Sequence, residues 1–192
     1  MQSDINLRLG LIYGSVRPGR FCDTVADWSA REIDAYGGFT LDRIDPKHLG
    51  LTGWQDDEQQ TARLRRQIDQ ADGFIVVTPE YNHGYPAVLK ALIDSAYDEW
   101  QAKPVGFVSY GGAAGGLRAV EQLRQVFAEL HTVTLRDSVS IAHPWDRFGA
   151  DGRLHDGGVA RQTLHTLLAH LNWWSAALRS ARESTPYRQI AA

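Results

Sequence analysis

Apolar residues along the chain follow two patterns that alternate from its beginning to its end. Short segments that are continuously apolar, or that alternate apolar with polar positions, predict β-strands where glycine, proline or polar residues bound them. Longer segments with apolar residues at every third or fourth position predict helices. The predicted strands cover 7–13, 39–44, 73–78, 104–109 and 132–141. The predicted helices cover about 21–36, 61–71, 88–96, 117–130 and 164–178.

The regular alternation of strands and helices predicts an α/β fold. Strands that are joined through helices run parallel, and right-handed crossovers then cover the sheet on both sides. The segment 73–78, GFIVVT, is apolar throughout and therefore predicts a central strand. Two segments are interpreted as connections, a long loop from 45 to about 60 and a short candidate linker at 144–158. We expect one domain over residues 1–192, because this length suits a single core.

Ligands of such sheets bind beyond the carboxyl ends of the strands, where the strand order reverses. The loops after the first, third and fourth strands are therefore the candidate site. The first loop, GSVRPGR, places Ser15, Arg17 and Arg20 before a helix, where backbone N–H groups and the helix dipole favour an anion. It lacks both the GxGxxG pattern of dinucleotide sites and the GK[ST] of ATP-type loops. Taken alone, a solvated turn with surface arginines is the alternative interpretation.

The other two loops suit a flat ligand. In TPEYNHGYP, Pro79 holds the backbone extended, which leaves the amides of Glu80, Tyr81 and Asn82 available to a heterocycle. The alternative is a turn that caps the next helix, with Asn82 or His83 as the cap. The segment SYGGAAGG, at 109–116, contains four glycines that let the backbone approach a ligand, or that simply form a flexible loop. The position of all three loops at one predicted edge favours a shared site.

Composition and charge argue against several other classes of function. Lys and Arg number 20 against 23 Asp and Glu, and the net charge of −3 provides no basic surface for nucleic acid. The single cysteine, Cys22, cannot form an internal disulfide or a zinc cluster. His165 and His170 lie off the helical spacing that aligns metal ligands. No apolar run approaches the roughly 20 residues that cross a bilayer. We therefore expect a cytoplasmic protein with neither a metal nor a membrane span.

Three segments resemble a known family when they are taken in order: GSVRPGR, TPEYNHGYPAVLKALIDSAYDEW and SYGGAAGG. They are similar to the NADPH-dependent FMN reductase-like flavoproteins, a group with a flavodoxin-like fold that includes quinone, azo-dye and chromate reductases. The resemblance covers about residues 7–141. It implies a three-layer, flavodoxin-like sandwich with a five-stranded parallel sheet of order 2-1-3-4-5. It also implies FMN as the cofactor and NADPH or NADH as the electron donor.

The resemblance further implies where the cofactor binds. The FMN phosphate would lie at the first loop, the ribityl chain and isoalloxazine along the second, and the far edge of the ring against the third. The implied cofactor-binding residues are Ser15, Arg17, Arg20, Phe21, Cys22, Pro79, Glu80, Tyr81, Asn82, Ser109, Tyr110, Gly111, Gly112 and Gly115. No catalytic side chain is expected, because the flavin carries the reactivity.

These observations predict an FMN-dependent NAD(P)H oxidoreductase that passes hydride through FMN to a quinone, azo compound, flavin or similar small acceptor by a ping-pong mechanism. The alternatives are a flavodoxin-type electron carrier and a flavin-free binding domain that keeps only the sheet. In the family that the chain resembles, the helix at 88–96 tends to join subunits, which predicts a homodimer or homotetramer. Trp145 and Phe148, in the loop after the last strand, are expected to pack within the protein, and the alternative is that one of them covers a ligand ring or packs against a second subunit.

Overall fold

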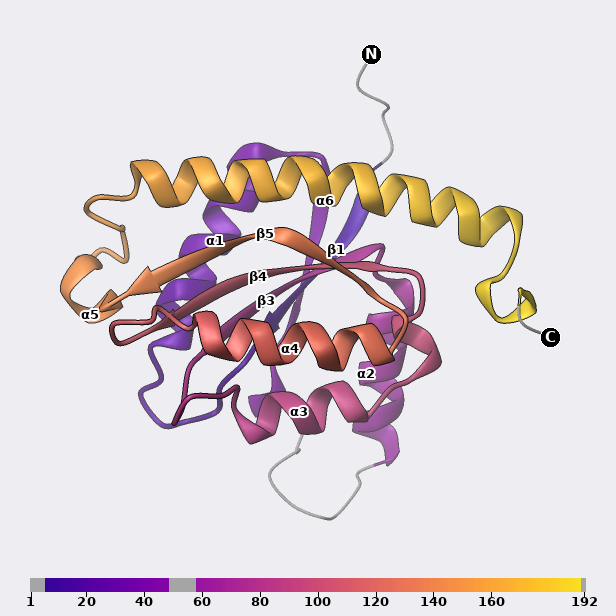
Figure 1. The fold of residues 1–192 in the computed structure, drawn as a ribbon, viewed down its shortest axis with the longest axis horizontal. Coiled ribbons are helices and arrows are strands. Elements are labelled where there is room, and N and C mark those ends of the chain that lie inside the picture. Colours follow the sequence, from indigo (N-terminus) through magenta and orange to yellow (C-terminus); the bar gives the residue numbers. More distant parts are fainter. Residues whose placement is uncertain (1–5, 49–57, 191–192) are drawn as a thin grey trace.

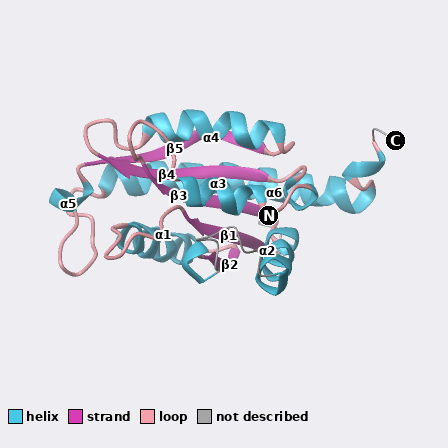
Figure 2. Ribbon diagram, turned by 90° about the horizontal axis from the view of Figure 1, so that it is seen from below, coloured by secondary structure: helices cyan, strands magenta, loops and turns pink. Residues whose placement is uncertain are grey.

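The computed structural model describes residues 6–48 and 58–190, so most of the loop predicted at 45–60 lies outside the described residues. Five parallel strands form one sheet in the order β2-β1-β3-β4-β5, and Figure 2 shows them side by side in this order. The strands are β1 (Leu7–Tyr13), β2 (Phe39–Ile44), β3 (Gly73–Pro79), β4 (Pro104–Gly111) and β5 (Val133–Ala142). The predicted flavodoxin-like sheet is thereby confirmed.

Helices cover both faces of this sheet and complete a three-layer sandwich (Figure 1). The helices are α1 (Cys22–Tyr36), α2 (Glu58–Gln70), α3 (Ala87–Asp94), α4 (Leu117–Glu129), α5 (Pro144–Arg147) and α6 (Gly158–Ser184). One apolar cluster joins the sheet to α1 and α6, and a second joins it to α2, α3 and α4. Both central strands, β3 and β4, are buried along their whole length, as a strand covered on two faces must be.

The last helix is longer than its apolar pattern predicts. The predicted segment, 164–178, contains the leucines that α6 buries, at Leu164, Leu167, Leu168 and Leu171. The helix nevertheless begins at Gly158 and ends at Ser184, and its yellow end extends past the sheet in Figure 1. The pattern missed both ends because those turns leave most of their side chains exposed to water.

The interpretation of 144–158 as a linker is wrong, because this segment is structured. It contains the short helix α5, and an antiparallel bridge between Phe148 and Leu154 folds the remainder back on itself. The Phe148 ring packs edge-on against Phe21 and Trp28, so this segment belongs to the α1 face of the core. Among the described helices, none has both the length and the hydropathy that a bilayer span requires.

Candidate functional site

The loops after β1, β3 and β4 lie at the carboxyl edge of the sheet, where parallel strands bring them together. Tyr81 joins the first two loops. Its hydroxyl lies 2.8 Å from Ser15 Oγ, and the Arg17 guanidinium lies 3.6 Å above the centre of its ring. Side chains that are 66 residues apart in the chain are thus in direct contact.

Glu80 joins the second loop to the third. Its backbone N–H donates to the carbonyl of Tyr110 at 3.1 Å, and its carboxylate forms an ion pair of 2.6 Å with Arg118 Nε. The backbone N–H of Arg118 also donates to this carboxylate, at 3.2 Å. Since the Glu80 side chain is only 7% exposed, its charge stabilises the start of α4 and is largely shielded from a ligand. Arg118 is a site residue that the sequence analysis missed.

The segment 81–84 forms a tight turn whose two end residues exchange main-chain hydrogen bonds of 2.9 and 3.2 Å. Its central residues, Asn82 and His83, have φ angles of 50° and 73°, in the left-handed region that non-glycine residues seldom adopt. Arg118 holds the turn through His83 Nδ1 at 2.9 Å. The turn does not cap α3, since the N-cap residue of that helix is Pro86 and no side chain caps it. Asn82 is exposed at the open side of the edge.

Arg20 faces the β2 side of the first loop. Its guanidinium donates to both carboxylate oxygens of Asp45, one of them at 2.8 Å, to Asp23 at 2.9 Å and to the Ser15 carbonyl. The side chain is 4% exposed, and the hydrogen bonds to Asp45 raise the pKa of Arg20. Arg20 therefore fixes the shape of the loop and has its charge already paired.

The open side of the first loop offers other donors to an anion. The N-cap residue of helix α1 is Phe21, which makes no side-chain cap, so backbone N–H groups of the first turn remain available. Arg17 is exposed beside them, whereas Ser15 is fully buried, with its hydroxyl bonded to Tyr81 and accepting from the Arg17 N–H. Gly19 has a φ of 63°, and a Cβ atom there would meet nothing within 4 Å. The chemistry of this donor set fits a phosphate group.

One half of the glycine-rich loop is tightly built. The hydroxyls of Ser109 and Ser140 both donate to the carbonyl of Gly115, at 2.8 and 3.0 Å. Gly115 and Gly116 have φ angles of 57° and 88°, and a Cβ atom on Gly116 would lie 2.6 Å from the Cβ of Ser109. Glycine is required at these positions because both the backbone conformation and the available space exclude a side chain.

The other half of this loop is open. A Cβ atom on Gly112 would meet no atom within 4 Å, and both Gly112 and Ala113 are exposed. The amides of these two residues donate to no other residue in the part of the chain that the structure describes. They provide free hydrogen-bond donors. Glu80 lies close to this loop, because a Cβ atom added to the adjacent Gly111 would be 3.5 Å from the Glu80 Cβ. Such a cradle fits the polar edge of a flat ring.

Three predicted site residues point their side chains into the core. Cys22 is fully buried, and burial raises the pKa of its thiol to about 11, so it is unreactive. Tyr110 is 5% exposed, and burial raises the pKa of its phenol. The Phe21 ring packs against Tyr110 and Phe148 at 6.3 and 5.7 Å. These residues support the loops from below. The expectation that Trp145 packs within the protein is wrong, because its side chain is 55% exposed at the same edge and its ring lies edge-on to His143.

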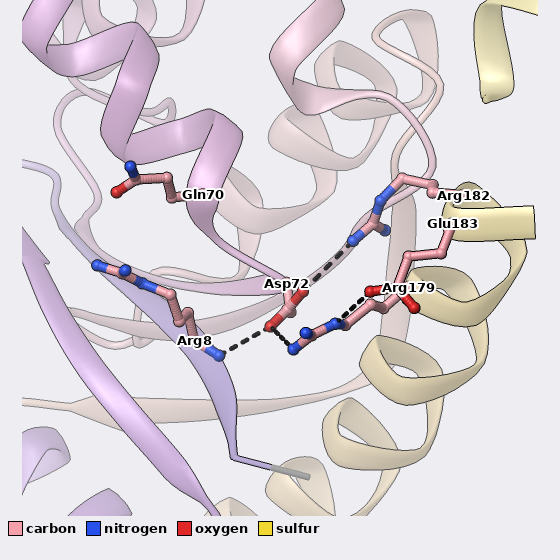
Figure 3. Close-up of a pocket in the computed structure, with 6 residues that line it drawn as sticks. All are labelled: Arg8, Gln70, Asp72, Arg179, Arg182 and Glu183. Atoms are coloured by element: carbon pink, nitrogen blue, oxygen red, sulfur yellow. Dashed lines mark hydrogen bonds and ion pairs between the residues drawn. The ribbon is translucent and has the colours of Figure 1, made fainter.

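A different polar pocket, of about 300 Å³, lies at the amino edge of the sheet (Figure 3). Its lining residues are Arg8, Gln70, Asp72, Arg179, Arg182 and Glu183. The Asp72 carboxylate accepts hydrogen bonds from the Arg8 amide at 2.9 Å and from Arg179 Nη1 at 3.3 Å, and Arg182 Nη2 lies 3.5 Å away. These contacts anchor the far half of α6, and none of the predicted site residues is part of them.

The strand order and the three joined loops at the carboxyl edge define a flavodoxin-like α/β protein. The chain matches the family model described as NADPH-dependent FMN reductase over residues 7–146, and it belongs to that family. This match confirms the predicted resemblance, together with FMN and NAD(P)H as the cofactor and electron donor of the family.

Individual relatives agree with this assignment. The chain is 37% identical over 138 residues to an NAD(P)H-dependent FMN reductase of Schizosaccharomyces pombe, an alignment that spans 64% of this chain and 66% of that protein. It is 31% identical to a 2-hydroxy-1,4-benzoquinone reductase of a Burkholderia species, over 92% of this chain and 98% of the relative. The solved flavoenzyme FerB, an NAD(P)H:(acceptor) oxidoreductase from Paracoccus denitrificans, superposes with a TM-score of 0.67 at 21% identity, over 89% of this chain and 98% of FerB. This last likeness shows a common fold.

Proposed function

We propose that this chain is one FMN-binding domain that acts as an NAD(P)H-dependent oxidoreductase and reduces quinones, azo compounds, flavins or similar small acceptors. The observation that carries the proposal is the joining of the three loops through Tyr81 and Glu80, which leaves donor groups open on one side. The relatives named above, an FMN reductase and a benzoquinone reductase, support the same class of reaction.

The first loop holds the phosphate of FMN in this proposal. Arg17 and the backbone amides around Phe21 and Cys22 donate to the phosphate oxygens, since these groups lie near the uncapped start of α1. The buried Ser15 hydroxyl takes part by exchanging its bond to Tyr81 for one to the phosphate. Arg20 contributes indirectly, because its bonds to Asp45 and to the Ser15 carbonyl hold the loop in shape. The single positive charge of Arg17 therefore carries most of the side-chain attraction.

The second and third loops hold the ring. Pro79, Glu80, Tyr81 and Asn82 form one wall, mainly through their main chain, with the Asn82 amide available at the open side. The opposite wall is the main chain at Ser109, Tyr110, Gly111, Gly112 and Gly115, which the serine hydroxyls stabilise from below. Bound FMN supplies hydride transfer between a nicotinamide and an acceptor. The amides of Gly112 and Ala113 donate to the ring edge where reduction places negative charge.

Donor and acceptor use the same open face in turn, which gives ping-pong kinetics. The sequence contains no nucleotide-binding fingerprint of the GxGxxG type. This supports a nicotinamide donor that binds at the flavin and has no dinucleotide-binding unit of its own. Parallel lines in double-reciprocal plots at several acceptor concentrations are expected. Intersecting lines would mean that both substrates bind together and would contradict this part of the proposal.

A spectroscopic experiment tests the function. The purified protein is loaded with FMN, and NADPH is added without oxygen, after which a benzoquinone is supplied. Rapid bleaching of the flavin followed by recovery with the quinone is the expected result. Slow bleaching would favour the flavodoxin-type carrier, for which the net charge of −3 provides little of the acidic docking surface that such carriers present. A protein that remains colourless with FMN would overturn the proposal.

We also propose a homodimer or homotetramer and a cytoplasmic location. The outer side of α3 has small and half-buried residues, and Tyr97 beyond it is 53% exposed, which supports a subunit contact there. The only cysteine is a buried, free thiol, which suits a reducing compartment. Light scattering of the purified protein tests the assembly, and a monomeric mass would contradict it.

A further inference from the structure

A cavity of about 470 Å³ lies at the carboxyl edge, on the β2 side of the first loop. Its walls come from the end of β1, the start of α1, the end of β2 and helix α2. Arg20 belongs both to this cavity and to the loop that we assign to the FMN phosphate. The cavity therefore borders the proposed flavin site, on the side away from the ring.

The charged groups of this cavity do not all neutralise one another. Its three carboxylates are bonded to two arginines, Asp23 and Asp45 to Arg20, and Asp27 to Arg43 at 2.5 Å. Two further cations, Lys47 and Arg63, also line the cavity.

Lys47 and Arg63 stand out from the other cations of the cavity. Both residues are exposed, and their charged ends make no ion pair or hydrogen bond within the described ranges 6–48 and 58–190. The cavity thus has two cationic groups that an anion can bind without breaking an existing ion pair.

The position of these cations suggests which anion they bind. In dinucleotide-binding α/β folds, a carboxylate near the end of the second strand recognises the 2′-hydroxyl of the ribose, whereas a nearby arginine accommodates a 2′-phosphate. Asp45 follows β2 directly, but Arg20 occupies both of its oxygens, which weakens it as an acceptor for a ribose hydroxyl. Lys47 and Arg63 remain, and they suit a phosphate.

We infer that Lys47 and Arg63 bind the 2′-phosphate of NADPH and make the enzyme selective for NADPH over NADH. The inference rests on the proposed function, in which the nicotinamide of the donor binds against the flavin ring. The nicotinamide and the 2′-phosphate are at opposite ends of the donor. In this inference the donor crosses the first loop, with its nicotinamide on the flavin ring and its 2′-phosphate in this cavity.

Kinetics with both donors test the inference. In the FMN-loaded Lys47→Ala/Arg63→Ala variant, we expect the KM for NADPH to rise roughly tenfold or more, since the lost bonds are to a charged group. The KM for NADH and the affinity for FMN stay unchanged. Arg66→Ala is the matched control, because it removes the same charge from α2 at a residue outside the cavity. An unchanged NADPH-to-NADH preference in the double variant would overturn the inference.

Calorimetry gives a second readout that does not depend on turnover. The probes are 2′,5′-ADP, 5′-AMP and inorganic phosphate, each titrated into the wild-type protein and the double variant. We expect the wild type to bind 2′,5′-ADP about tenfold more tightly than 5′-AMP, and the double variant to bind both equally. Equal binding by the wild type would overturn the inference, as would a double variant that loses FMN affinity. A wild type that never binds FMN instead contradicts the proposed function, while these titrations still report on the cavity.

Discussion

The carboxyl and amino edges of the sheet are both rich in charged side chains, but they use them differently. At the amino edge, Asp72 is bonded to the main chain of β1 and lies against two arginines of α6, and Lys103 donates to two carbonyls at the end of α2 at 2.7 Å. At the carboxyl edge, the side chain of the exposed Arg17 has the Tyr81 ring as its only partner among residues 6–48 and 58–190. Charges at the first edge anchor structure. At the second edge Arg20 and Glu80 are also paired, but Arg17 remains available to a ligand.

The main chain differs between the two edges in its unpaired amides and not in its left-handed residues. Left-handed residues occur at the carboxyl edge, at Asn82, His83, Gly115 and Gly116, and at the amino edge, at Gly37, Gly38, Ala102 and His131. The amides of Gly112 and Ala113, at the carboxyl edge, have no partner among the described residues. Strained or unsatisfied backbone costs free energy and persists where the surroundings hold it in place. The comparison indicates that the core and the amino edge stabilise the fold. This stability offsets the cost of keeping groups at the carboxyl edge open to a ligand.

The largest expected effect comes from filling the tight half of the glycine-rich loop. Gly116→Ala places a Cβ atom 2.6 Å from Ser109 Cβ in a left-handed conformation, and we expect it to lower the free energy of unfolding by about 3 kcal/mol. Gly112→Ala, in the open half, is the control and should change stability by less than about 0.5 kcal/mol. Urea unfolding without FMN measures both. Equal losses would mean that the two halves do not differ as described.

Arg17→Ala tests whether charges at the carboxyl edge serve binding. We expect FMN affinity to fall by roughly 1.5–3 kcal/mol, the range for hydrogen bonds to charged groups, because the phosphate loses its exposed arginine. The affinity for riboflavin, which lacks the phosphate, should not change, and neither should stability in urea. Fluorescence titration with the two flavins measures the difference. A parallel loss of riboflavin affinity would place Arg17 against the ring instead.

Asp72→Ala is the matching test at the amino edge. The substitution leaves Arg179 and Arg182 without their shared carboxylate, and we expect the free energy of unfolding to fall by about 2 kcal/mol. This is below the loss for a fully buried pair, because Arg179 is 39% exposed. FMN affinity should be unaffected. A variant of normal stability with weakened FMN binding would reverse the roles that we assign to the two edges.

The smallest effect is a pH dependence at Lys103. Burial lowers the pKa of this amine to about 8 in the folded protein, below its ordinary value of 10.5. Above pH 8 the unfolded chain therefore binds more protons, and the stability of the wild type should rise relative to Lys103→Met, by about 1 kcal/mol from pH 8 to 9. Cys22 and Tyr110 shift in the opposite direction but are common to both proteins. A difference that is constant with pH would contradict this expectation.

The sequence by itself determined the order of the elements and the position of the candidate site. Each strand is a short segment that is either apolar throughout or alternates apolar with polar residues, and each helix has its own periodic stripe, so both can be predicted from neighbouring residues. Alternation then requires a parallel sheet, which places the loops of Ser15, Tyr81 and Gly112 at one edge. The boundaries were less accurate where a helix such as α6 leaves the core, because exposed turns have no required pattern.

Only the tertiary structure decided which charges are paired and which remain open. Arg17 and Arg20 are equivalent in the sequence, yet Arg20 is bonded to Asp45 and Arg17 lies over Tyr81. Glu80 contacts Arg118, 38 residues further along the chain, and Asp72 contacts Arg179 of α6, 107 residues further along. Such pairs depend on how separate elements pack against one another, and no local pattern of residues specifies that arrangement.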